Sequence, residues 1–199
     1  MSWDFVSADV SDPVAVFRGW LAEAEATEIN DPNAVALATA TTEGVPSVRM
    51  VLLKQMDARG FVFFTNTESQ KGRELEENPV AAMCFHWKTQ RRQVRVEGTV
   101  TELPGVEVDA YFKSRSRGSQ LGAVVSRQSL PLESRDVLVE LVKECEARFP
   151  GEIPRPDYWG GYVLRPTRIE FWQQGVDRLH DRMVFVQEAD GWVGTRLFP

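Results

Sequence analysis

The chain has 199 residues, of which 43% are hydrophobic and 26% are charged, and its formal net charge is −6. This composition excludes fibrous and disordered proteins and allows one sizeable core, so we expect a single domain over residues 1–199. The acidic balance argues against nucleic-acid binding, which requires a basic face.

A helix is predicted near the start of the chain. We expect residues 1–10 to be flexible and residues 11–28 to form this helix, because Ser11 or Asp12 can cap it and Pro13 suits its first position. Apolar side chains then recur at the spacing of one buried helical face, at Phe17, Trp20, Leu21 and Ala24. The pattern favours a structural role for this helix.

The period then changes to that of β-strands. Residues 34–41, 47–56 and 61–65 are apolar or β-branched runs separated by turn-forming clusters, which is typical of antiparallel hairpins. Further strands are expected at 80–87, 93–103, 161–164, 168–172, 183–187 and 192–197, and helices after residue 69 and at 106–113 and 134–149. This order predicts a mainly β protein of the α+β class, with a β-barrel or strongly bent sheet and helices packed outside.

The cysteine content indicates neither disulfides nor metal binding. Cys84 and Cys145 are too few for a disulfide framework and lack metal-ligand spacing, so we expect two reduced thiols and no metal site. The first residues lack a basic region followed by an apolar stretch, and no segment approaches the roughly 18 uninterrupted apolar residues of a membrane helix. We therefore expect a cytoplasmic protein that does not contact a membrane.

The segment 169–182 gathers an indole, two guanidinium groups and an imidazole, from Trp172, Arg178, His180 and Arg182. A guanidinium pairs with phosphate and lies flat against rings, and an indole offers a flat surface with one N–H donor. The segment therefore indicates a site for a planar, anionic ligand. The alternative is a buried strand that ends in a solvated turn.

Two earlier segments also offer groups that bind anions. Arg49 and Lys54 are five residues apart, so a regular strand would point them to opposite faces and serve two anion sites, unless a bulge realigns it. In residues 64–73 a strand end leads into a helix, whose free N–H groups and Lys71 can receive a phosphate. The alternatives are strand-end charges that reach water on long stems, and a capped surface helix.

Residues 111–120 concentrate three cations, hydroxyl donors and Tyr111 within an acidic protein. Such a run is commonly a solvated face, but its donors can also bind a phosphate. Together with residues 64–73, this segment gives the chain ligands for two separate anion sites.

These motifs, in this order, resemble the pyridoxine/pyridoxamine 5′-phosphate oxidases, FMN enzymes of vitamin B6 metabolism. The resemblance runs from about Asp31 to the closing residues 196–199, and it also includes residues 92–94, 126–129 and 159–162. It implies an FMN-binding split β-barrel that works as a homodimer, with each flavin held in a cleft between the subunits.

The resemblance also implies which residues form the site. Those expected to bind FMN are Arg49, Met50, Val51, Leu52, Leu53, Lys54, Phe64, Thr65, Gln70, Lys71, Gln93, Gln128, Ser129, Trp172 and Arg182. Those expected to bind the substrate are Lys54, Tyr111, Arg115, Ser119, Arg178, Leu179 and His180. Lys54 belongs to both groups, which fits a position between flavin and substrate better than a strand with cations on two faces.

The implied reaction oxidises the C4′ alcohol of pyridoxine 5′-phosphate or the C4′ amine of pyridoxamine 5′-phosphate to pyridoxal 5′-phosphate. Hydride passes to FMN, and O₂ reoxidises the flavin and gives H₂O₂. The residues expected to act in catalysis are Arg178, His180 and Asp31, with Arg178 and His180 holding the reacting carbon against the flavin. Arg178 is an unsuitable base because a guanidinium stays protonated, so His180 and, less so, Asp31 are the candidates for the base.

Two positions depart from the family pattern. Gln70 stands where many relatives have Arg, which should weaken one anion contact, and Phe64 stands where Tyr is common. Alternative functions are a related FMN oxidase of phenazine biosynthesis, which resembles the chain over residues 69–75, and a noncatalytic flavin- or pyridoxal-phosphate-binding protein. The joint presence of Lys54, Tyr111, Arg115 and Ser119 favours the vitamin B6 enzyme.

Overall fold

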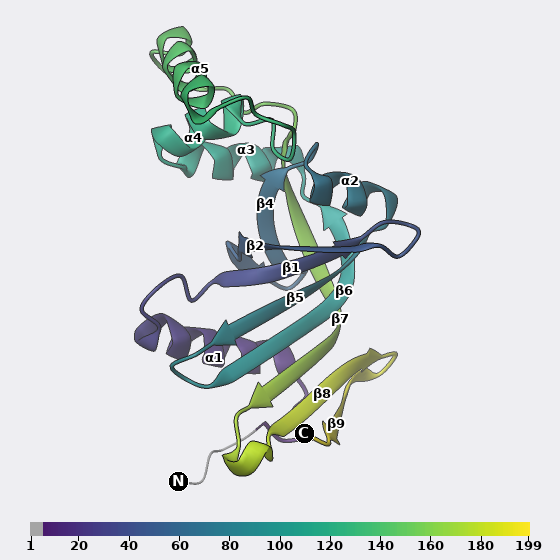
Figure 1. Ribbon diagram of the computed structural model, residues 1–199. Helices are drawn as coiled ribbons and strands as arrows, with labels where there is room; N and C mark the ends of the chain where they lie inside the picture. Colours follow the sequence, from purple (N-terminus) through teal and green to yellow (C-terminus); the bar gives the residue numbers. More distant parts are fainter. Residues whose placement is uncertain (1–5) are drawn as a thin grey trace.

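The computed structural model describes residues 6–199 and consists of one curled antiparallel sheet with helices around it (Figure 1). The helices are α1 (Pro13–Thr27), α2 (Gln70–Glu77), α3 (Gly105–Ser114), α4 (Arg117–Val125), α5 (Arg135–Arg148) and the short 3₁₀ helix η1 (Val176–Arg178). The strands are β1 (Ala34–Ala40), β2 (Pro46–Leu52), β3 (Gln55–Asp57), β4 (Gly60–Asn66), β5 (Val80–Trp87), β6 (Arg92–Glu102), β7 (Trp159–Gln173), β8 (Asp181–Glu188) and β9 (Gly191–Leu197). The predicted mainly β, α+β class is confirmed.

The first helix begins as the sequence indicated, and Asp12 rather than Ser11 caps it. The Asp12 carboxylate accepts hydrogen bonds from the N–H groups of Val14 and Ala15, and Pro13 occupies the first position of the helix. Of the segment expected to be flexible, residues 1–5 lie outside the described part of the chain. Val6, the first described residue, is buried in the core beneath the sheet.

Strand β7 pairs with three other strands of the sheet, β4, β6 and β8. The strand order is β2-β1-β5-β6-β7-β4-β3, and β8 pairs with the later part of β7 and continues to β9. We expected two strands, at 161–164 and 168–172, but β7 is continuous from Trp159 to Gln173. The register of β6 against β7 shifts between Glu97 and Gly98, and this irregularity lets Pro166 remain inside the strand.

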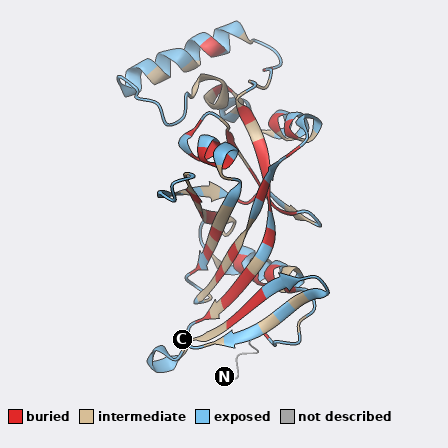
Figure 2. Cartoon of the chain, turned by 90° about the vertical axis from the view of Figure 1, so that its right-hand side faces the viewer, coloured by how far each residue is buried: buried red, intermediate tan, exposed pale blue. Residues whose placement is uncertain are grey.

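Two apolar clusters hold the fold together. In the larger cluster α1 packs on one face of the sheet, where the Phe17 ring meets Phe61 and Phe85 edge-on with centroids 4.9 Å apart in each case. The smaller cluster joins β4 and β7 to α3, α4 and α5 around Phe112 and Trp159. Figure 2 shows buried residues following the long strands, whereas α5 is largely exposed.

Helices α3, α4 and α5 gather at one end of the molecule, and the turn with η1 and the β8–β9 hairpin lies at the other end (Figure 1). Strand β7 connects these two ends. Among residues 6–199 no helix is long and apolar enough to cross a membrane.

Candidate active site

A cavity of about 980 Å³ opens where β2, β4 and α2 meet α3 and α4. This is at the upper end of the roughly 300–1,000 Å³ of small-molecule sites. Its wall includes these residues of the predicted site: Arg49, Met50, Val51, Leu52, Lys54, Phe64, Thr65, Gln70, Lys71, Tyr111, Arg115, Ser119, Gln128 and Ser129. Leu53, which was predicted with them, is buried in the core instead.

A break after β2 brings Arg49 and Lys54 to the same cavity. The strand expected over 47–56 ends at Leu52, and β3 begins at Gln55. In the break Leu53 N–H donates to Asn33 O at 2.9 Å, and Lys54 N–H donates to Val62 O, also at 2.9 Å. A regular strand would have pointed the two cations to opposite faces, but the strand is interrupted between them, because the chain changes hydrogen-bonding partner there.

Lys71 lies at the start of α2, in a cradle of neutral oxygens. Its Nζ donates to Thr65 Oγ1 and Ser69 Oγ at 3.0 Å each and to Gln128 Oε1 at 2.7 Å. Burial, together with the nearby charge of Arg49, lowers the pKa of Lys71 to about 8. No carboxylate pairs with this ammonium among the described residues, so its charge is available to a bound anion.

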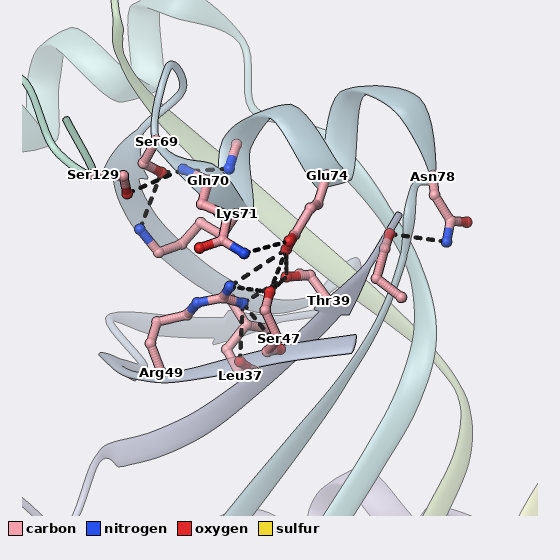
Figure 3. A network of polar contacts seen from close by, with 12 residues as sticks. Leu37, Thr39, Ser47, Arg49, Ser69, Gln70, Lys71, Glu74, Asn78 and Ser129 are labelled. Atoms are coloured by element: carbon pink, nitrogen blue, oxygen red, sulfur yellow. Dashed lines mark hydrogen bonds and ion pairs between the residues drawn. The ribbon is translucent and has the colours of Figure 1, made fainter. Parts of the chain in front are cut away.

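The loop of residues 126–129, which follows α4, packs against the N-terminus of α2. Ser129, whose φ of 75° is left-handed, accepts a hydrogen bond at 3.1 Å from Gln70 N–H in the first turn of α2 (Figure 3). Thr65 donates to Gln128 at 3.2 Å and Asn66 donates to Ser126 O at 3.1 Å. Residues 126–129 are thus fixed beside the helix N-terminus, a favourable place for a phosphate.

Arg49 is held by a buried carboxylate that the sequence analysis missed. Arg49 donates to Thr39 and Ser47 at 2.5 Å each, and its second terminal nitrogen lies 3.3 Å from Glu74 Oε2 (Figure 3). Burial raises the pKa of Glu74, but hydrogen bonds from Ser47, Thr39 and Gln70 and the charge of Arg49 outweigh it and lower the pKa to about 2. The sequence did contain one signal for this carboxylate: Gln70 and Glu74 are four residues apart on an expected helix, a spacing that allows their side chains to form a hydrogen bond.

The second predicted anion site lies across the cavity, at the junction of α3 and α4. Arg115 follows α3, Ser116 caps α4, and Ser119 lies in the first turn of α4. One terminal nitrogen of Arg115 is buried and has no hydrogen-bond partner among the described residues. Burial lowers the pKa of Arg115 and raises that of Tyr111. An unsatisfied buried donor of this kind points to an anionic ligand.

The remaining predicted residues form a second group at the other end of β7. Gln93 is opposite Trp172 in the β6–β7 ladder, and Trp172 is opposite Arg182 in the β7–β8 ladder. The ring of His180 lies 4.7 Å from that of Trp172. Arg182 binds the buried carboxylate of Glu170 at 2.7 Å.

A tight turn between β7 and β8 exposes Arg178 and Leu179 of this second group to solvent. A side chain at Gly175 would come within 1.8 Å of Leu179 O, so only glycine allows this close approach. Arg178 is exposed, with a left-handed φ of 64°, and Leu179 is 72% exposed. Gly175 N–H donates to His180 Nδ1 at 3.2 Å, so in the neutral ring the hydrogen is on Nε2.

The two groups do not meet within one chain. Trp159, at the cavity, and Trp172, at the turn, are thirteen positions apart on β7, a distance of roughly 40 Å along an extended strand. Asp31 also lies outside the cavity wall, exposed on the turn before β1 with a φ of 37°. Any ligand that contacts both groups must therefore contact two copies of the chain.

The cavity suits a ligand with anionic groups and a flat ring. Its wall carries four cations, Arg49, Lys54, Lys71 and Arg115, and no acidic side chain among the described residues. Alternate residues of β2 leave Val48 and Met50 exposed beside these cations, which gives a ring an apolar surface. In a protein of net charge −6 this concentration of positive charge is a local specialisation.

Comparison with known proteins finds one family over most of the chain. Residues 21–149 match the family described as pyridoxamine 5′-phosphate oxidase, and residues 159–199 match the pyridoxine 5′-phosphate oxidase C-terminal dimerisation region. A pyridoxine/pyridoxamine 5′-phosphate oxidase of Anaeromyxobacter dehalogenans is 60% identical, over 94% of this chain and 96% of its own. One of Rhizobium meliloti is 56% identical, over 96% and 94%.

Solved structures show the same fold. PhzG from Burkholderia lata, in complex with tetrahydrophenazine-1-carboxylic acid, superimposes with a TM-score of 0.92 at 33% identity and covers 98% of both chains. A pyridoxamine 5′-phosphate oxidase-related, FMN-binding protein of Nostoc punctiforme has a TM-score of 0.76 at 18% identity and covers 92% of this chain and 97% of its own.

Proposed function

The chain belongs to the pyridoxamine 5′-phosphate oxidase family, and we propose that it oxidises pyridoxine 5′-phosphate or pyridoxamine 5′-phosphate to pyridoxal 5′-phosphate, with FMN as cofactor and O₂ as final acceptor, in the cytoplasm. The observation that carries the proposal is the cavity, whose wall has four cations and no acidic side chain within residues 6–199. The cavity has two groups of phosphate-binding side chains, which we call stations, one around Lys71 and one around Arg115. They match one phosphate on the cofactor and one on the substrate.

The station at Lys71 is assigned to the FMN phosphate. Lys71, Thr65 and Gln128 already share hydrogen bonds there, and Ser129 lies at the N-terminus of α2. The hydroxyls of Thr65 and Ser129, the amide NH₂ of Gln128 and the ammonium of Lys71 would donate to the phosphate. Arg49 would add a guanidinium fixed by Glu74. Bound flavin supplies the hydride acceptor that no side chain can provide.

The station at Arg115 is assigned to the substrate phosphate. Arg115 offers an unpaired N–H group, and Lys54, Tyr111 and Ser119 line the same cavity. These groups would bind and orient the substrate in the same cavity as the residues assigned to FMN. Tyr111 and Arg115 are not bases at neutral pH, because burial raises the pKa of Tyr111 and a guanidinium stays protonated.

A second copy of the chain is assigned the other half of the site. It would bring the exposed turn with Arg178, Leu179 and His180, together with Gln93, Trp172 and Arg182, over the open cavity. The matched C-terminal dimerisation region includes this turn, and exposed Leu179 and Val176 give it an apolar contact surface. Homodimerisation would then exclude water and complete the site.

Within this arrangement His180 is a hydrogen-bond donor. Its Nδ1 accepts from Gly175 N–H, so Nε2–H of the neutral ring is the atom that can reach the substrate. Arg178 keeps its charge and orients the substrate. The proton that leaves the alcohol substrate is therefore assigned to water rather than to His180 or Asp31. The neutral amine substrate needs no base at this step, because loss of hydride turns it into an iminium ion that water then hydrolyses.

The proposal is tested by incubating the purified, FMN-loaded protein in air with each 5′-phosphate separately. Pyridoxal 5′-phosphate together with H₂O₂ is the expected outcome. A flavin-loaded protein that is inert with both substrates contradicts the proposal and favours a phenazine-type substrate, given the similarity to PhzG.

A further inference from the structure

The segment Trp159-Gly160-Gly161-Tyr162 begins β7, and none of its residues has been assigned a role in ligand binding so far. Trp159 is only 6% exposed, yet it lines the cavity next to the proposed substrate phosphate station. Packing in the core explains why residue 159 is large and apolar. It does not explain why the Trp159 ring lies beneath the guanidinium of Arg115.

Three aromatic rings lie nearly parallel at the wall of the cavity. Tyr111 stacks on Phe64 with centroids 3.9 Å apart and an interplanar angle of 15°. Phe64 in turn stacks with Trp159 at 5.5 Å and 8°. The stack joins α3, β4 and β7, so the three elements fix the plane of the Trp159 indole.

Gly161 makes this stack possible. Phe64 and Gly161 are opposite each other in the β4–β7 ladder. A Cβ atom at Gly161 would lie 2.7 Å from the Phe64 ring and 2.8 Å from Leu103, and would push the ring out of line. Gly161 therefore leaves the space that the Phe64 ring needs to stack at the wall of the cavity.

Arg115 lies over the face of the Trp159 indole, with its guanidinium carbon 4.7 Å from the ring centroid. Unlike Arg49 and Arg182, which are paired with Glu74 and Glu170, Arg115 has no ion pair among the described residues. A ring face attracts and orients a cation without neutralising it or using its N–H groups. A carboxylate in the same place would compete with an incoming anion.

We infer that Trp159 is a positioning residue for substrate recognition: its indole face holds the Arg115 guanidinium, still charged and with free donors, toward the substrate phosphate. The inference rests on the proposed function. It assigns to Trp159 an effect on phosphate recognition and none on hydride transfer or on the flavin.

The test compares Trp159→Phe, which keeps a ring face, with Trp159→Leu, which removes it. Trp159→Leu should raise KM for the phosphorylated substrate about tenfold, as expected for loss of a partly buried cation–π contact, with kcat within about twofold. Trp159→Phe should stay within about threefold of wild type. FMN affinity should be unchanged in both variants.

A matched control and a double variant separate positioning from folding. Phe149 lies under Arg148 at 5.1 Å, outside the cavity wall, so Phe149→Leu removes a comparable ring face and should leave KM unchanged. In the Arg115→Ala background, Trp159→Leu should add no further increase in KM. Equal effects in both backgrounds, or a parallel loss of FMN affinity, would overturn the inference.

A binding measurement separates this inference from the proposed function. Pyridoxal 5′-phosphate and unphosphorylated pyridoxal are titrated into the FMN-loaded wild-type and Trp159→Leu proteins. The variant should bind the phosphate ester about tenfold more weakly and pyridoxal equally well. A wild-type protein that shows this discrimination without turnover would contradict the proposed function alone; equal binding of the ester by both proteins, or none by wild type, would overturn the inference.

Discussion

Glu74 lies 3.3 Å from Arg49 beneath the cavity, so a buried carboxylate sets the position of one of the four cations that line it. The carboxylate also accepts hydrogen bonds from Thr39, Ser47 and Gln70. A negative charge this well satisfied stabilises the fold and leaves less of the Arg49 charge for the phosphate than a free guanidinium would offer.

The first prediction concerns the pH dependence of stability. The pKa of Glu74 falls from 4.5 to about 2 on folding, so its stabilisation is complete above pH 4.5 and is lost as the pH falls toward 2. A shift of this size corresponds to roughly 3 kcal/mol in the free energy of unfolding. Glu74→Gln should be less stable at pH 6 and lose less stability on acidification, as measured by denaturant unfolding between pH 6 and 3. Parallel pH profiles for the two proteins would contradict the assignment.

The second prediction concerns Lys71 and flavin affinity. Its folded pKa of about 8 is below the ordinary 10.5, so the free protein loses this charge as the pH rises through 8. FMN affinity should therefore fall above pH 8, by up to roughly tenfold per pH unit. Lys71→Met should bind FMN weakly at pH 7 and show a flat profile in a fluorescence titration from pH 7 to 9. Lys143→Met, on exposed α5, is the control and should follow wild type.

The third prediction separates the two phosphate stations. Arg115→Ala removes the unpaired donor at the substrate station and leaves the contacts of Lys71 intact. KM for the phosphorylated substrate should rise on the order of 100-fold, as for a lost charged hydrogen bond, while FMN content stays near that of wild type. Steady-state kinetics and the flavin absorbance of the purified protein measure the two quantities. Equal losses of both would mean that the stations are wrongly divided.

Local patterns in the sequence predicted most elements, but not that the strand expected at 47–56 is broken or that β7 is continuous. The cap at Asp12 and the hairpins of β1 to β4 follow from residue types within a few positions. The break at Leu53 carries no glycine or proline, because it arises from a change of partner to Asn33 and Val62. Conversely, two strands were expected at 161–164 and 168–172, but β7 continues through Pro166, where its register with β6 shifts.

The candidate site was predictable as a set of residue types but not as an arrangement. The resemblance named the cations and aromatic residues of the site. The hydrophobic pattern of the sequence did not predict that one continuous strand, β7, would separate Trp159 from Trp172. Supporting residues such as Glu74 were missed because a glutamate on a short helix is commonly exposed, and only the fold places it beneath Arg49.

The central claim, that each site is built from two copies of the chain, is tested most directly with a mixed dimer. One copy carries Arg115→Ala in the cavity and the other carries His180→Ala in the turn, with different tags so that the mixed dimer can be purified. If the sites are shared, one site of the mixed dimer has both changes and the other has neither, so activity at low substrate concentration should return to about half that of wild type. A mixed dimer as impaired as either parent would contradict the account.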